Sequence, residues 1–410
     1  MTVPVLFVQP VSDLAGAEFS LRQLVLHLRA PYRPIVALPD GPLRDLLERE
    51  GVTTERLPFT SRWHYFVKTY RPDRLVASGL GVAAMTARVV ALARKHQAQI
   101  LHANTVLAAP YVAAAALTLR RPYVLHLRDY TIPRLPRRLF NWAARSSHCT
   151  TIFISHALRR HFMTAEWPYR HVVIPNCIDT DRFAAAADGT AFRREHGLAP
   201  DDLVVGVAGR VERWKGFDTF VSAVGALADR FPRLRAVVVG DVFAGGDPTA
   251  RQLLLDQVRA LGLEERVRFT GFRSDIASAL ASLDVFVHCP REPEPFGRVA
   301  IEAMACARPV VAANHGGLVE IVRPGETGML VRPDDPTALA GALATLLENP
   351  ALRERLGGQG LAVVRDQFSP ERHVAAVSAV YSDLLNRDCS APQSLESSTC
   401  HPSFSSGGRQ

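Results

Sequence analysis

The sequence predicts an α/β protein made of two consecutive domains, each with a parallel sheet, that face each other across a central cleft. Three observations lead to this fold class. Short β-branched runs alternate with amphipathic helical stretches, which is typical of βαβ units. The alternation stops near the middle of the chain and then restarts. The 410 residues are enough for two separate hydrophobic cores.

The first domain, residues 1–183, is expected to hold five strands. Their sequences are PVLFVQ (4–9), PIVAL (34–38), ILHA (100–103), YVLHL (123–127) and TTIFIS (150–155). Amphipathic stretches such as GAEFSLRQLVLHLR (16–29) supply the helices between them. A Gly-x-Gly-x-x-Ala pattern at 79–84 lacks the acid that a dinucleotide site needs about 20 residues later. We therefore interpret that pattern as helix packing.

Residues 175–189, PNCIDTDRFAAAADG, are interpreted as a linker to the second domain, residues 184–369. Its expected strands are LVVGVAG (203–209), RAVVVGD (235–241), RVRFTG (266–271), DVFVHC (284–289), PVVAA (309–313) and GMLV (328–331). A last helix, 370–388, is expected to cross back to the first domain. The serine-rich tail, 389–410, is expected to be disordered.

Composition favours a cytoplasmic protein with an anionic ligand. The formal net charge is +8, and the only lysines are Lys68, Lys95 and Lys215. A basic chain suits phosphates, nucleic acid or an acidic membrane surface. The six cysteines are scattered without zinc-ligand spacing, which indicates a reducing compartment. The N-terminal stretch lacks a basic region and is expected to be a strand rather than a signal peptide.

The stretch VAGRVERWKGFD (207–218) places two cations on a turn between a strand and a helix. Arg210 and Lys215 flank this turn. Free backbone N–H groups and the helix dipole favour an anion at such a place. The turn therefore predicts phosphate binding, and the alternative is a solvated basic turn.

The stretch EPEPFGRVAIEAMACARPVV (292–311) carries Glu294 and Glu302, which stand eight residues apart. Flanking prolines keep Glu294 out of a regular helix. A helix is expected from about Phe296, with unpaired N–H groups at 297–299 and with Arg298 and Glu302 on one face. Paired carboxylates suit acid–base catalysis, a metal site or recognition of a polyhydroxy ligand. The geometry suits a nucleotide sugar, but for the pair of glutamates alone an exposed glutamate and a helix-surface glutamate are the more common case.

Together with AGAEFSL (15–21), ISHALRR (154–160), PNCIDTDRF (175–183), GGLVEIV (316–322) and GETGMLV (325–331), these stretches closely resemble the retaining glycosyltransferases of family 4. The resemblance covers nearly everything except the last two dozen residues. It implies a GT-B fold of two Rossmann-like domains, with the nucleotide-sugar donor on the second and the acceptor mainly on the first. The activity it implies is that of a retaining, metal-independent hexosyltransferase.

The resemblance also implies roles for residues at matching positions. Arg210 and Lys215 would hold the donor diphosphate, Glu294 the sugar hydroxyls and Glu302 the ribose. The implied catalytic set is His126, Glu294, Arg210 and Lys215. The implied donor-binding residues are Gly16, Arg210, Lys215, Phe272, Arg273, Glu294, Phe296, Gly297, Arg298, Val299 and Glu302. The implied acceptor-side residues are Ala15, Glu18, Asn104, Arg128 and Asp129.

Three departures from the family pattern stand out. Ala15 replaces the first glycine of the usual Gly-Gly-Ala-Glu loop, which is expected to stiffen that loop. Cys177 replaces the glycine of the usual Pro-Asn-Gly, and a cysteine disfavours a positive φ there. Arg128 and Asp129 directly follow His126, and we interpret them as specific to the acceptor.

The segment 120–145 is strongly basic, with seven arginines and one acid, and Phe140 and Trp142 are interleaved with the charges. Such a stretch suits an anionic membrane surface or a lipid phosphate, and the alternative is a solvated basic helix. Residues 62–74, RWHYFVKTYRPDR, form a second basic and aromatic patch. No stretch resembles a nucleic-acid module, so no nucleic-acid partner is expected.

The function expected is transfer of a sugar from a nucleoside diphosphate to an acceptor hydroxyl in bacterial polysaccharide, glycolipid or natural-product glycoside biosynthesis. A nucleotide-sugar epimerase or hydrolase and a catalytically silent sugar-nucleotide-binding protein are the alternatives. No cofactor and no metal is expected, because Arg210, Lys215 and a helix N-terminus already supply positive potential at the diphosphate. The protein is expected in the cytoplasm, with peripheral contact at the inner face of the membrane as an option.

Overall fold

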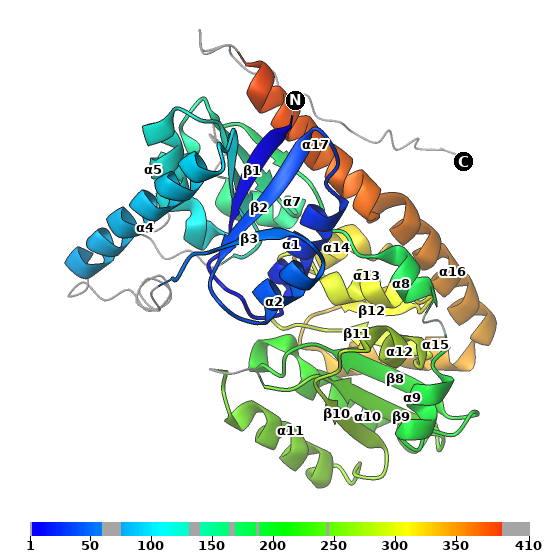
Figure 1. The fold of residues 1–410 in the computed structure, drawn as a ribbon. Coiled ribbons are helices and arrows are strands. Elements are labelled where there is room, and N and C mark those ends of the chain that lie inside the picture. The colour runs from blue at the N-terminus through cyan, green and yellow to red at the C-terminus, as the bar shows by residue number, and fades with distance from the viewer. Residues whose placement is uncertain are drawn as a thin grey trace.

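The computed structural model of the protein describes residues 2–59, 75–130, 140–163, 169–185, 188–242 and 246–387. Figure 1 shows two α/β lobes, one above the other, with a long helical segment running along one side of both. The chain completes most of the first lobe before it enters the second. This is the two-domain α/β architecture that the sequence predicts.

The first domain is built on a parallel sheet. Among the described residues its strand order is β3-β2-β1-β4-β5-β6-β7. The strands are β1 Val3–Val8, β2 Tyr32–Leu38, β3 Thr53–Arg56, β4 Ile100–Ala103, β5 Tyr123–Leu127, β6 Cys149–Phe153 and β7 His171–Val173. The helices are α1 Gly16–His27, α2 Pro42–Arg49, α4 Leu75–Lys95, α5 Ala109–Leu119, α7 His156–Phe162 and α8 Thr180–Ala185, with a 3₁₀ turn, η2, at Val106–Ala108.

The second domain has a parallel sheet with the order β10-β9-β8-β11-β12-β13 in the described part of the chain. Its strands are β8 Leu203–Ala208, β9 Leu234–Val239, β10 Val267–Gly271, β11 Val285–His288, β12 Val310–Ala313 and β13 Gly328–Val331. Its helices are α9 Thr190–Glu195, η3 Arg213–Lys215, α10 Phe217–Leu227, α11 Thr249–Ala260, α12 Ile276–Ala281, α13 Arg298–Ala305, α14 Leu318–Ile321, α15 Pro336–Glu348 and α16 Pro350–Gln367.

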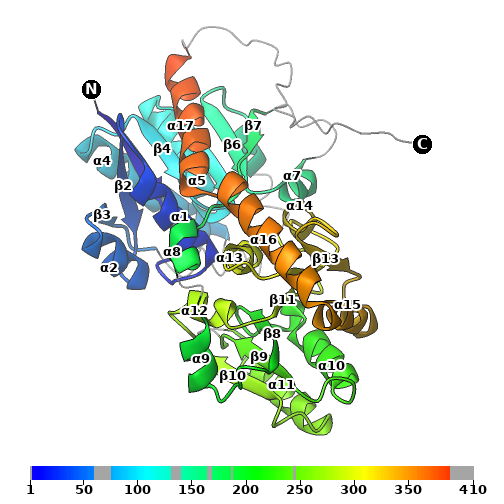
Figure 2. The same cartoon turned by 90° about the vertical axis from the view of Figure 1, so that its right-hand side faces the viewer.

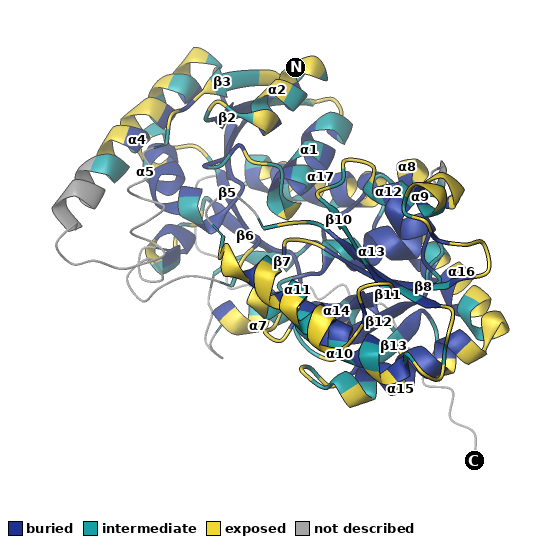
Figure 3. Ribbon diagram, turned by 90° about the horizontal axis from the view of Figure 1, so that it is seen from below, coloured by how far each residue is buried: buried dark blue, intermediate teal, exposed yellow. Residues whose placement is uncertain are grey.

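Helices cover both faces of each sheet, which explains why the central strands are apolar runs rather than alternating ones. Figure 3 shows these strands as buried and the outer helix faces as exposed. In the first sheet β1 pairs with both β2 and β4, and all of these pairings are parallel. The carboxyl ends of neighbouring strands therefore lie at one edge of the sheet. That edge carries Gln9 after β1, Asn104 after β4 and Arg128 after β5.

The chain returns to the first domain through its last helices. Helix α16 packs against α13 of the second domain, and α17 (Pro370–Asn386) packs against α1 of the first. Figure 2 shows the two helices following each other along the molecule. Ser369 caps α17, because its hydroxyl accepts from the Arg372 N–H at 3.4 Å. The Tyr32 hydroxyl donates to the Ser378 carbonyl at 3.2 Å, which ties α17 to β2.

The segment 175–189 contains more structure than a linker. Residues 180–185 form α8, which packs on α13. Asn176 and Cys177 are buried. The sequence-based interpretation of this segment as a plain linker is therefore too simple, because the segment supplies side chains to the interior of the first domain.

Candidate functional site

Loops at the carboxyl ends of the two sheets meet at the interface between the domains. The Arg298 guanidinium, from the second domain, lies 4.8 Å from the centre of the Phe19 ring in α1. The Tyr130 hydroxyl, which follows β5, donates to the Glu294 carbonyl at 3.4 Å. In open parallel sheets ligands bind at this edge. The interface is therefore the candidate functional site, and the sequence-predicted Glu294 and Arg298 border it.

Glu294 forms the centre of the site. Its Oε2 accepts from Lys215 Nζ at 2.9 Å and lies 2.6 Å from His288 Nε2 at the end of β11. The side chains of Glu294 and Lys215 are only 13% and 11% exposed. Burial alone would raise the pKa of Glu294, but Lys215 and His288 outweigh burial and hold the pKa below its ordinary value. Glu294 is therefore an ionised acceptor at neutral pH.

The turn between β8 and α10 carries Lys215 to this place. Gly216 has φ +69°, and a Cβ there would lie 2.0 Å from the Cys289 carbonyl oxygen, so the turn packs directly on the end of β11. The Arg291 N–H also donates to the Trp214 carbonyl at 2.7 Å. Lys215 Nζ lies 4.2 Å from the centre of the Trp214 ring. The turn and the Glu294 loop are thus one packed unit.

Arg210, the second cation predicted for the diphosphate, is oriented differently. Its Nη2 lies 3.6 Å from Glu212 Oε2, and its side chain is 47% exposed. Glu212 also accepts from Trp214 Nε1 at 2.7 Å. The structure therefore pairs Lys215 with Glu294 and Arg210 with Glu212. Both cations remain on the predicted turn, and each lies near a different carboxylate.

The helix after the Glu294 loop begins later than expected. The sequence predicts a start near Phe296, but α13 begins at Arg298, because Gly297 has φ +102°, outside the helical region. Phe296 is buried and packs against Phe368, with 5.9 Å between the ring centres. Val299 lies in the first turn of α13. Gly297 is thus the bend that separates the loop from the helix.

Glu302 lies one turn into α13 and is nearly buried. Its Oε1 accepts from Arg298 Nη2 at 2.8 Å, which places the two residues on one helix face as the sequence predicts. Burial raises the pKa of Glu302, although the charges of Arg298 and Arg182 oppose the rise.

Phe272 and Arg273 follow β10. The Phe272 side chain is 70% exposed, and Arg273 forms ion pairs with Glu195 and Asp275.

A buried polar network joins the acceptor-side residues of the first domain. Glu18 Oε1 accepts from Gln9 Nε2 at 2.7 Å, and Gln9 Oε1 accepts from Asn104 Nδ2 at 2.8 Å. Arg128 then donates to Asn104 Oδ1 at 3.0 Å and also to Asn176. Burial raises the pKa of Glu18 to about 7 and lowers the pKa of Arg128 to about 10. The network thus runs across the carboxyl ends of β1, β4 and β5.

His126 lies in the interior of the first domain and is fully buried. Its Nδ1 is 3.3 Å from both His102 Nε2 and Arg128 Nη2, and its ring lies over His373 of α17, with 6.2 Å between the centres. Burial and the charge of Arg128 lower the pKa of His126 well below its ordinary value. Contact of His126 with a reacting sugar stays a prediction.

The departures from the family pattern fit without strain. Ala15 is extended, with φ −133°, so it does not need the freedom of a glycine. Cys177 is absent from the described non-glycine residues with positive φ. No atom lies within 4 Å of a Cβ built on Gly16, so this position is open rather than crowded. Asp129 is exposed beside the buried Arg128.

Some residues of the site were missed in the sequence. His288 and Gln9 each stand at the carboxyl end of a strand, and that position alone could have identified them. Asp179 and Asp181 form an Asp-x-Asp triplet, whose carboxylate oxygens are of the kind that a divalent ion prefers. In the structure the Asp179 carboxylate accepts from the Arg182 N–H at 3.0 Å, at the start of α8. Among the described residues no group of three or more His, Cys, Asp or Glu side chains could hold a metal ion.

Only some of the described residues in the basic segment 120–145 are exposed. Residues 131–139, and the patch at 62–74, lie outside the described residues. Arg128 is buried, and Phe140 is buried against Phe162, so neither belongs to an exposed face, contrary to the sequence-based interpretation. Trp142 is 46% exposed. In the part of the chain that is described, no helix is both long and apolar enough to span a membrane.

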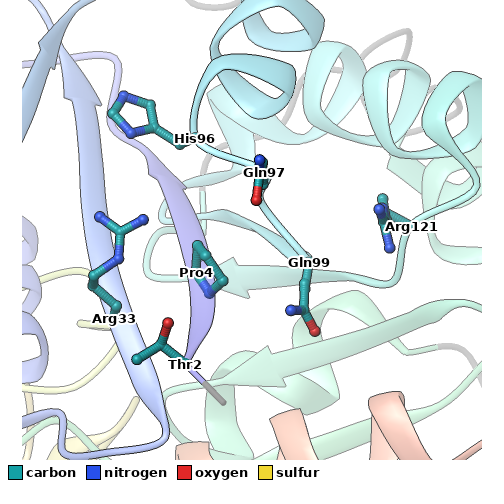
Figure 4. A pocket seen from close by; sticks show the side chains of 7 residues that line it. All are labelled: Thr2, Pro4, Arg33, His96, Gln97, Gln99 and Arg121. Atoms are coloured by element: carbon teal, nitrogen blue, oxygen red, sulfur yellow. The ribbon is translucent and has the colours of Figure 1, made fainter.

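One cavity of about 400 Å³ lies far from this interface. Figure 4 shows its lining at the amino ends of β1, β2 and β4, opposite the edge that carries Arg128. Its lining residues are Thr2, Pro4, Arg33, His96, Gln97, Gln99 and Arg121. None of the sequence-predicted site residues is among them.

Comparisons with known proteins cover both halves of the chain. The family model Glycosyltransferase Family 4 matches residues 14–182, and the model Glycosyl transferases group 1 matches residues 188–362. The solved structure of Anabaena HepE in complex with UDP and glucose is 29% identical, covers 92% of this chain and 99% of its own, and superposes with a TM-score of 0.78.

Two curated relatives are similar in sequence. A D-inositol 3-phosphate glycosyltransferase from Actinosynnema mirum is 38% identical over 220 residues, which is 52% of each chain. The lipopolysaccharide core biosynthesis mannosyltransferase LpcC from Rhizobium leguminosarum bv. viciae is 36% identical over 256 residues, 57% of this chain and 71% of that protein. The match thus spans about half the length of the first relative and over two thirds of the second.

Proposed function

Since the chain belongs to glycosyltransferase family 4 and has the GT-B fold, we propose that it transfers a hexosyl sugar from a nucleoside diphosphate to an acceptor hydroxyl. The product belongs to bacterial polysaccharide, glycolipid or natural-product glycoside biosynthesis. The lipopolysaccharide enzyme from Rhizobium leguminosarum supports this setting.

The observation that carries the proposal is that Lys215 and His288 hold one oxygen of the Glu294 carboxylate at the domain interface. Lys215 and His288 both contact Oε2, so we assign Oε1 to the hydroxyls of the donor sugar. An ionised carboxylate accepts several hydrogen bonds at once, and bonds to a charged acceptor are the stronger kind. A loop carboxylate held in this way orients the sugar and does not attack its anomeric carbon.

The departing diphosphate needs positive charge where its own negative charge grows. Lys215 supplies it next to Glu294, and the half-exposed Arg210 lies on the same turn. The first turn of α13 adds free backbone N–H groups. We assign the ribose to Glu302 and the base to the segment at Phe272. UDP in the HepE complex supports a uridine donor, and a guanosine donor is the alternative.

We further propose retention at the anomeric carbon without a metal ion. The leaving phosphate takes the acceptor proton, so an enzyme nucleophile is not required. The acceptor lies against the first domain, near Arg128 and Asp129, where the polar network ends. The enzyme works in the cytoplasm, and the exposed arginines of segment 120–145 meet an anionic membrane or a lipid-linked acceptor.

A panel of nucleotide sugars in a thermal-shift assay identifies the donor, because a ligand that binds only the native state raises the Tm. Release of nucleoside diphosphate is then measured with and without acceptor. Release only in the presence of acceptor supports transfer. Release without acceptor supports a hydrolase or epimerase, and binding without release supports a silent nucleotide-sugar-binding protein.

A further inference from the structure

Helix α7 of the first domain begins at the domain interface and is capped by residues of both domains. Its own N-cap residue, Ser155, accepts from the Leu158 N–H at 3.0 Å. Glu320 of α14, in the second domain, accepts from the His156 N–H at 2.8 Å and from the Ala157 N–H at 2.6 Å. Figures 1 and 2 show α7 and α14 side by side between the lobes. The first turn of α7 is thus completed by a carboxylate from the other domain.

The Ser155 hydroxyl also reaches the Glu294 loop. It donates to the Pro295 carbonyl at 2.6 Å while its oxygen accepts from Leu158. A serine hydroxyl has a single hydrogen, so Ser155 donates its one hydrogen bond to the Pro295 carbonyl of the loop. Its oxygen accepts from the Leu158 N–H of the helix. Ser155 is 1% exposed, so water does not substitute for either bond.

The loop itself is held from both sides. The Glu294 carbonyl accepts from the Gly317 N–H at 2.7 Å, within the second domain, and from the Tyr130 hydroxyl at 3.4 Å, from the first. A Cβ on Gly316 would lie 2.5 Å from the Glu294 carbonyl oxygen, so the backbone of the second domain lies directly against the loop. The loop that presents the Glu294 carboxylate is therefore clamped between the two domains.

We propose that Ser155 and Glu320 are positioning residues for Glu294. Their contacts join α7 to the second domain and fix the backbone at residues 294–295, so the sugar-binding carboxylate is oriented only when the two domains are in contact. This inference rests on the proposed function of Glu294. It assigns to the first domain a share in binding the donor sugar, in addition to binding the acceptor.

The bonding pattern predicts which substitutions matter. Ser155→Ala loses both bonds, whereas Ser155→Thr keeps a hydroxyl on a residue whose extended backbone suits a β-branched side chain. Glu320→Gln replaces one acceptor oxygen with an NH₂ group that faces an N–H donor. Asn349→Ala is the matched control for the lost cap, because Asn349 caps α16 through Leu352 within the second domain.

Glu326→Gln is the matched control for the lost charge. Glu326 pairs with Arg323 at 2.8 Å and belongs to the same domain as Glu320, but its pair does not cross the interface. All five variants are purified as the full chain. Their unfolding by urea is recorded first, so that only folded variants enter the comparison.

The deciding measurement compares the affinity of each variant for the nucleotide sugar with its affinity for the corresponding nucleoside diphosphate. For Ser155→Ala and Glu320→Gln we expect the nucleotide-sugar affinity to fall about 10-fold. We expect the diphosphate affinity to change less than about twofold, because the diphosphate lacks the sugar that Glu294 binds. Ser155→Thr and both controls should keep the wild-type ratio.

Equal loss of both affinities would overturn the proposal, because it would mean general damage rather than misplacement of the Glu294 loop. Unchanged nucleotide-sugar affinity in both variants would overturn it as well. Hydrogen exchange provides a readout that does not depend on the substrate. Glu320→Gln should speed exchange of the His156 and Ala157 amides. Unchanged exchange would contradict the proposed role of Glu320 in joining α7 to the second domain. If the wild type binds no nucleotide sugar, the proposed function fails while this exchange result still stands.

Discussion

Replacing Lys215 with Met leaves the Glu294 carboxylate with His288 as its remaining partner. The Lys215–Glu294 pair is nearly buried, with both side chains less than one seventh exposed. Removing one partner of a buried pair costs about 3–5 kcal/mol, because the other charge is left without compensation. Since His288 stays in place and some solvent reaches both groups, we expect a loss of about 2–3 kcal/mol in the free energy of unfolding.

The sign of the pH dependence follows from the pKa of Glu294. In the wild type this pKa lies below the ordinary 4.5, so the carboxylate stabilises the fold above that value and loses its contribution only in acid. Without Lys215, burial is opposed by His288 alone, so we expect the pKa of Glu294 to rise. The loss in Lys215→Met should therefore shrink as the pH is lowered from about 8 to about 5.

Urea unfolding at both pH values measures this loss. Lys95→Met is the matched control, because Lys95 is 62% exposed and its pair with Glu55 is worth at most about 1 kcal/mol. The double variant Lys215→Met/Glu294→Gln should recover most of the stability, since a neutral amide needs no counter-charge, but it should stay inactive. The reasoning is refuted if Lys215→Met lowers the free energy of unfolding at pH 8 no more than Lys95→Met does. It is also refuted if adding Glu294→Gln to Lys215→Met does not raise that free energy.

Three further outcomes are expected. Gly297→Ala should lose about 1–3 kcal/mol of stability in urea unfolding, because φ is +102° and the new Cβ would lie 2.4 Å from Leu318 Cδ2; an unchanged midpoint would contradict this. Activity should survive EDTA, and proton NMR should show an α-linked product from an α-linked donor; a β-linked product or rescue by a divalent ion would overturn that mechanism. The protein should sediment with anionic vesicles more than with neutral ones, less so in high salt, and equal partitioning would favour a solvated basic face.

The sequence predicts the central strands of both sheets well, because strands buried on both faces are continuous apolar runs. It misses β3 and β7, which lie at the two edges of the first sheet. β3 has the sequence Thr-Thr-Glu-Arg and is not fully buried at any position, so it has neither an apolar run nor a clear alternation. Its pairing depends on β2 rather than on its own residues.

The sequence predicts which residues belong to the candidate site, but it does not predict which of them contact each other. Lys215 and Glu294 are both found in the sequence, yet the sequence assigns one to phosphate and the other to sugar. Their contact joins residues 79 positions apart and follows from the packing of Gly216 on β11. The burial of His126 is equally invisible in the sequence, because it depends on α17, almost 250 residues away. Such contacts come from tertiary packing alone.

The hydrogen-bond network beside α17 includes Arg128, which can only donate, and this constrains the protons of His126 and His102. The Tyr381 hydroxyl lies 2.7 Å from His102 Nδ1, and we assign it as the donor, which places the proton of His102 on Nε2, facing His126 Nδ1. Arg128 Nη2 lies 3.3 Å from that Nδ1 and can only donate, so we assign the acceptor role to Nδ1 and the proton of His126 to Nε2, a buried atom without a hydrogen-bond partner among the described residues.

Both histidines are therefore neutral, which agrees with the lowering of their pKa values by burial and by Arg128. A second proton on His126 would place an N–H group against the guanidinium. Arg128 is thus the positive charge around which this network is built, and Asn104 and Asn176 turn their oxygens toward it. Burial lowers the pKa of Arg128 only to about 10, so the guanidinium keeps its charge at neutral pH among these partners.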